Sequence, residues 1–191
     1  MANKHVNLDS LFNDIADAIR ETTETSDLII ADDFPDVIRN ILPVEPYLTF
    51  KSPNSFTLAV KDTTKHWDGT LEYSTDASTW RNWNGTTTLS STTSGSRKVL
   101  YLRGTGNTVI SGYAENCGWV LTVTDIKCIG NIENLLDYAT VASGNHPTMG
   151  PACYYTLFQG CTSLTRAPAL PATTVSSLGY GWMFQGCTSL T

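Results

Sequence analysis

The sequence has few charged side chains, and basic ones are especially scarce. Only 16% of its 191 residues are charged, and 12 Lys and Arg against 18 Asp and Glu give a net charge of −6. Binding to a phosphate backbone requires clustered Lys and Arg, whereas here they are scattered along the chain. We therefore expect no nucleic-acid partner. The hydrophobic content of 41% is too high for a disordered chain, so most of the protein should fold.

Long apolar runs are also missing. No run approaches the roughly 18 residues that span a bilayer, so we expect no membrane insertion. The first residues, MANKHVNL, lack the apolar core of a secretory signal peptide. We therefore expect synthesis in the host cytoplasm and release inside a particle, rather than secretion.

Motifs that carry catalysis or bind metals are absent as well. The five cysteines are odd in number and have no CxxC spacing, which favours buried thiols over disulfides or a zinc site. His5, His66 and His146 lie far apart and outside any HExxH context. There is no phosphate loop and no GxSxG motif. The sequence thus predicts a protein that is not an enzyme and holds no metal or cofactor.

Residues 1–43 have the pattern of two short amphipathic helices. Apolar residues recur at i, i+3, i+4 and i+7, and Pro43 ends the second helix. So short a pair rarely buries enough apolar surface to fold alone. We therefore expect it to assemble with copies of itself or with another protein. The predicted assembly residues are Leu8, Leu11, Phe12, Ile15, Ile19, Val37, Ile38 and Ile41.

Residues 44–124 have the pattern of short strands separated by turns. Runs rich in Val, Thr and aromatic residues at 47–50, 55–60, 70–73, 99–103 and 119–124 alternate with turn residues. Residues 75–78 form a plausible hairpin turn. Trp119, Leu121 and Val123 recur at every second position, which predicts one buried face and one exposed to water. The spacing suits a small antiparallel β-sandwich.

Residues 125–191 contain an internal repeat. The phrase FQGCTSLT at 158–165 recurs at 184–191, an offset of 26 residues, and Tyr154 and Tyr180 keep the same offset. This period is typical of leucine-rich repeats, in which each coil packs on the next. Phe158 should therefore stack on Phe184, and Cys161 should lie beside Cys187. The predicted fold class is a multidomain α+β protein: a helical pair, a β-sandwich, and the start of a leucine-rich-repeat solenoid.

Aromatic side chains beside the repeated phrase are the candidate binding residues. Such rings stack on sugars or anchor protein interfaces, although core packing is the common alternative. Tyr155 and Trp182 do not match between the two repeats, as expected of a variable outer face. The candidate set is Tyr154, Tyr155, Tyr180 and Trp182.

Several stretches of the sequence resemble known families. The stretch LFQGCTSLTRAPALPATT at 157–174 resembles the repeat of BspA-like leucine-rich-repeat proteins, and GNIENLLD at 130–137 is similar to the stretch that precedes it. LFNDIADAIR at 11–20 resembles a module of phage and prophage tail proteins of Firmicutes. YSTDASTW at 73–80 is similar to a β-domain found before such repeats, with Ala77 where that family's hairpin has Gly.

These resemblances imply a structural tail or baseplate protein of a phage or prophage-derived particle. Residues 1–43 would bind other tail proteins and form a homo-oligomer. The repeats would bind a protein or polysaccharide of the host surface. One alternative is a cell-surface adhesin of the BspA-like family. A glycan-active enzyme is a further alternative, because residues 74–80 loosely resemble the Asp-box of sialidases.

Overall fold

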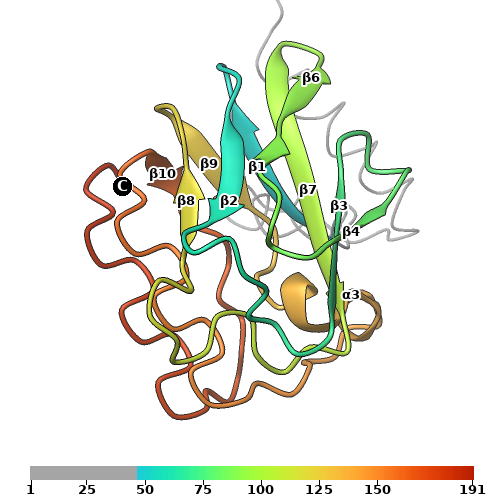
Figure 1. Ribbon diagram of the computed structural model, residues 1–191. Helices are drawn as coiled ribbons and strands as arrows, with labels where there is room; N and C mark the ends of the chain where they lie inside the picture. The colour runs from blue at the N-terminus through green and yellow to red at the C-terminus, as the bar shows by residue number, and fades with distance from the viewer. Residues whose placement is uncertain (1–46) are drawn as a thin grey trace, which may run out of the picture. The chain divides into compact units, whose positions relative to one another are not determined.

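A computed structural model describes residues 47–191, which belong to one compact unit (Figure 1). Two sheets and one helix, α3 (Asn134–Ala142), make up its regular structure. The larger sheet has the order β10-β9-β1-β7-β3-β4, with β6 also paired to β7. Its strands are β1 (Leu48–Ser52), β3 (Thr70–Ser74), β4 (Arg81–Trp83), β6 (Thr92–Ser94), β7 (Arg97–Thr105), β9 (Ile126–Ile129) and β10 (Leu164–Arg166).

The smaller sheet has the order β5-β2-β8 and shares a core with the larger one. It consists of β5 (Leu89–Ser90), β2 (Thr57–Val60) and β8 (Trp119–Leu121). The Trp119 ring lies 6.3 Å from Phe50 of β1 and 5.6 Å from Trp83 of β4. These contacts join the two sheets, which is compatible with the expected β-sandwich. Most of the predicted strands are confirmed, but β8 ends at Leu121, and Val123 is 41% exposed at a φ of 76°.

A close backbone approach holds α3 against the end of β7. A Cβ on Gly104 would lie 1.7 Å from the carbonyl oxygen of Leu135, so only glycine fits there. The buried Asn107 amide donates to the carbonyls of Thr70 (2.7 Å) and Leu135 (2.9 Å). Helix α3 is thereby fixed to the strands that precede it.

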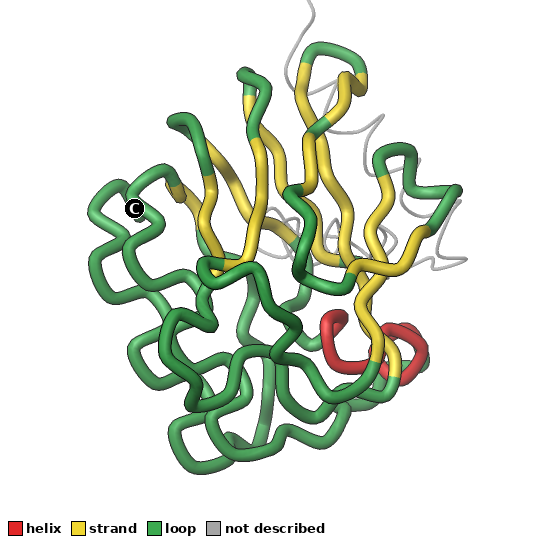
Figure 2. The backbone as a smooth tube through the Cα atoms, viewed as in Figure 1, coloured by secondary structure: helices red, strands yellow, loops and turns green. Residues whose placement is uncertain are grey.

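The repeated phrases form two stacked coils, coil 1 (residues 152–165) and coil 2 (residues 178–191), drawn mainly as loop in Figure 2. The Phe158 and Phe184 rings stack 5.7 Å apart at 8°, which confirms the predicted ladder. Alternate backbone N–H groups of coil 1 donate to coil 2 and to the residue just before it, at 2.8–3.0 Å. The donors are Ala152, Tyr154, Thr156, Phe158 and Gly160, and the acceptors are the carbonyls of Ser177, Gly179, Gly181, Met183 and Gln185.

The opposite side of coil 1 is hydrogen bonded to the β-sheet part of the chain. Its carbonyls at Cys153 and Leu157 accept from the backbone N–H groups of Ile110 (2.9 Å) and Trp119 (2.7 Å). The Lys61 ammonium group donates to the carbonyl of Gln159 (2.7 Å). Coil 1 therefore lies between coil 2 and the segments around β2 and β8.

The predicted fold class is wrong. Residues 47–191 are mostly β, with ten strands and one helix, and not a sandwich followed by a separate leucine-rich-repeat solenoid. Residues 125–191 supply β9, which pairs with β1, and β10, which pairs with β9. The coils are built from turns stacked on the β-sheets, because coil 1 uses those sheets to satisfy its carbonyls. The predicted helical pair and its assembly residues lie outside the described part of the chain.

Candidate recognition surface

The two coils share an unusual backbone conformation. In coil 1 φ is positive at Ala152 (52°), Thr156 (54°) and Gly160 (75°), and in coil 2 it is positive at the equivalent Leu178, Trp182 and Gly186. A positive φ is costly for residues other than glycine and persists only where the surroundings hold it. Here the hydrogen-bond ladder between the coils holds it. The coils are therefore a fixed scaffold for the side chains between these positions.

Three aromatic rings form a continuous surface on this scaffold, which we call the aromatic stripe. Tyr155 of coil 1 lies 5.5 Å from Trp182 of coil 2 and 5.7 Å from Tyr113, which precedes β8. Tyr113 is 60% exposed and Trp182 is 63% exposed, whereas Tyr155 is half-buried between them. The outer rings offer aromatic surface to a ligand, and the middle ring supports both.

The structure separates the four predicted binding residues into two pairs. Tyr155 and Trp182 belong to the aromatic stripe. Tyr154 and Tyr180 stack with each other at 5.5 Å and 8°, but Tyr154 is fully buried and its hydroxyl donates to the carbonyl of Ile132 (3.2 Å). Tyr154 therefore packs in the core, and Tyr180 is half-buried above it. Their role in binding stays a prediction.

Sequence reasoning missed Tyr113. Tyr113 lies outside the repeat and has no periodic relation to Tyr155 or Trp182. No pattern in the sequence therefore predicts that the three rings lie together. The Ser111 hydroxyl donates to the carbonyl of Tyr155 (2.8 Å), and this bond brings the 111–117 loop against coil 1. The Cys117 thiol also lies 3.5 Å from the Thr156 hydroxyl.

A second group of aromatic side chains packs around an arginine of the protein. The Arg103 guanidinium lies over the rings of Trp80 (4.1 Å) and Tyr138 (4.4 Å), and its Nε donates to the Glu72 carboxylate (2.8 Å). Tyr47 packs against Trp80 at 5.6 Å. The rings of Trp80 and Tyr138 already contact a cation of the protein itself, Arg103, so the aromatic stripe is the better candidate for binding a partner.

The loop that resembles an Asp-box has a structural role. The Asp76 carboxylate accepts from the backbone N–H groups of Thr79 (2.7 Å) and Ser78 (2.9 Å), and these bonds hold the pKa of Asp76 well below its usual range. Ala77 adopts a φ of 60°, a left-handed conformation that favours glycine. The carboxylate thus stabilises the turn between β3 and β4, which are paired in register.

Comparison with protein-family models, with characterised proteins and with solved structures finds no match to this chain. Within residues 47–191, no three His, Cys, Asp or Glu side chains are grouped so as to hold a metal ion. No helix in this described part is long and apolar enough to cross a membrane. All five cysteines are buried free thiols, as the sequence predicted.

Proposed function

We propose that this chain is a non-enzymatic tail or baseplate-associated protein of a phage or prophage-derived particle, and that its C-terminal part recognises the host surface. The observation that carries the recognition role is the aromatic stripe of Tyr113, Tyr155 and Trp182. The resemblance of residues 11–20 to a phage tail module supports the particle role.

Physical chemistry favours a binding role for the stripe. Exposed tryptophan and tyrosine rings supply large apolar area together with a polar group, and such residues are enriched where proteins bind partners. Tyr155 and Trp182 sit on coils held together by backbone bonds and by a bond from Gln159 to Gln185 (2.5 Å). A rigid aromatic surface loses little conformational entropy on binding. Either a polysaccharide or a protein of the host surface fits this chemistry.

The test of recognition compares two exposed residues of coil 2. Trp182→Ala removes the outer ring of the stripe, whereas Leu178→Ala removes an apolar side chain, 52% exposed, from an equivalent left-handed position. Binding of the purified protein to cell walls of the host bacterium should fall about tenfold or more for Trp182→Ala, as for a lost interface anchor. It should change little for Leu178→Ala. Equal binding by both variants and the parent would refute recognition through the stripe.

The assembly role is proposed for residues 1–43. Deleting them should convert a homo-oligomer into a monomer, as measured by mass in solution, because their predicted apolar stripe needs a partner. A full-length chain that is already a monomer, and stays a monomer after the deletion, would count against a tail role.

A bacterial surface adhesin is the second candidate, favoured by the resemblance of residues 157–174 to BspA-like repeats. The two candidates differ in where the protein resides. Labelled antibodies should find it on purified particles if the first proposal holds, and on intact, unlysed cells if the second does.

A further inference from the structure

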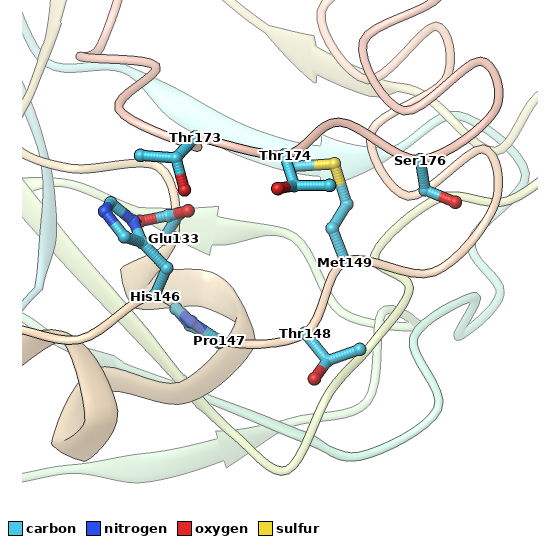
Figure 3. A pocket seen from close by; sticks show the side chains of 8 residues that line it. All are labelled: Glu133, His146, Pro147, Thr148, Met149, Thr173, Thr174 and Ser176. Carbon is cyan, nitrogen blue, oxygen red and sulfur yellow. The ribbon is translucent and has the colours of Figure 1, made fainter.

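A pocket of about 470 Å³ has a lining that includes none of the residues of the aromatic stripe (Figure 3). Its walls come from Glu133 at the start of α3, from residues 146–149, and from the link between the coils at residues 173–176. Its volume is within the range of small-molecule sites, which run from about 300 to 1,000 Å³. No residue predicted from the sequence to bind a ligand lines it.

The pocket contains a buried carboxylate with a single side-chain partner. Glu133 is 1% exposed, and its Oε2 lies 2.8 Å from His146 Nδ1. In Figure 3 the carboxylate and the His146 ring lie together at one end of the pocket. Among the described residues no other hydrogen bond to this carboxylate is formed. Because this side chain is 1% exposed, a ligand group that donates to its second oxygen would form a charge-assisted hydrogen bond largely shielded from water.

Several hydroxyl groups lie around this carboxylate. The hydroxyls of Thr148, Thr173 and Ser176 line the pocket and form no hydrogen bond within residues 47–191. The buried Tyr180 hydroxyl comes near the Ala172 backbone without hydrogen-bond geometry. Burial, reinforced by the negative charge of Glu133, raises the pKa of Tyr180 to about 12. The site thus combines one buried negative charge with several free hydroxyls.

The lining selects a class of ligand by its charge. No Lys or Arg lines the pocket, and its one basic side chain, His146, is already paired with Glu133, so an anion would find no free cation there. A primary ammonium group donates to the free carboxylate oxygen and neutralises its charge. The wall hydroxyls can then bond to hydroxyls of the same ligand. We propose that this pocket binds a small amino sugar, with its ammonium group against Glu133.

The experiment titrates the full chain with three matched sugars by calorimetry, in near-neutral buffer where most of the amine is still protonated. Glucosamine carries the ammonium group, glucose lacks it, and N-acetylglucosamine masks it. We expect saturable binding of glucosamine, and at least about tenfold weaker binding of the other two, as for loss of a charged hydrogen bond. Absence of saturable glucosamine binding, or equal binding of the three sugars, would overturn the proposal.

Two variants locate the site. Glu133→Gln keeps the shape and removes the charge, and it should lower glucosamine affinity at least about tenfold. Thr173→Phe fills the pocket from an exposed wall position and leaves Glu133 in place, so it should also block binding, even if Glu133→Gln fails to fold. Trp182→Ala should bind glucosamine like the parent, which separates this site from the proposed recognition function. Normal binding by Thr173→Phe would rule the pocket out.

Discussion

Coil 1 and coil 2 carry the same eight-residue phrase but lie in different environments. Phe158 and Leu164 of coil 1 are fully buried, whereas the equivalent Phe184 and Leu190 of coil 2 are half-buried. Coil 1 packs on Trp119 and Phe50 on one side and on coil 2 on the other. Identical residues therefore differ in burial because only coil 1 has a neighbour on both faces.

The backbone shows the same difference. Coil 1 accepts bonds from the β-sheet part of the chain and donates bonds to coil 2. In coil 2 the N–H groups equivalent to those donors, at Tyr180, Trp182 and Phe184, have no partner among the described residues. The thiols follow the stacking order, since Cys161 donates to the carbonyl of Trp119 (3.2 Å) and Cys187 to that of Phe158 (3.0 Å). Each coil is thus anchored to the layer before it.

Phenylalanine deletion should give the largest contrast between the coils. Phe158→Ala leaves a cavity among Phe50, Trp119 and Phe184, and should lower the free energy of unfolding by about 3–5 kcal/mol. Phe184→Ala removes a ring packed mainly on one face, and should cost roughly 1–2 kcal/mol because its site can refill with water. Urea denaturation measures both. Equal losses would show that coil 2 is as well packed as coil 1.

Glycine substitution should instead affect the two coils equally. Gly160 and Gly186 have φ of 75° and 76°. A Cβ added at Gly160 would meet nothing within 4 Å, and one added at Gly186 would meet only the Gly160 backbone, at 3.6 Å from its Cα and 3.7 Å from its N, which is ordinary contact. Alanine at either site should cost about 1–2 kcal/mol, the penalty of a left-handed conformation. Unfolding in urea should give values within experimental error of each other. A larger loss at Gly186 would mean that the ladder does not fix both coils alike.

The sequence predicted features that come from a repeating pattern of residues. It did not predict contacts between segments that lie far apart along the chain. The 26-residue offset predicted that Phe158 would stack on Phe184, and runs rich in Val, Thr and aromatic residues located β1, β3 and β7. It did not predict that Ile110 and Trp119 would cap coil 1, because single hydrogen bonds between segments about 40 residues apart leave no pattern. That missing contact explains the wrong fold class and the missed Tyr113.

Thiol alkylation should reveal the smallest difference. Burial, and then the neighbouring Cys187, raises the pKa of Cys161 to about 11, and burial raises the pKa of Cys187 as well. Cys187 is 9% exposed and Cys161 is 3% exposed, so iodoacetamide should modify Cys187 a few times faster in the folded protein. Peptide mass spectrometry distinguishes the sites. In urea both should react at one rate, because the same Gly and Thr flank each cysteine. Faster reaction of Cys161 under native conditions would contradict the conclusion that coil 2 is the less buried of the two coils.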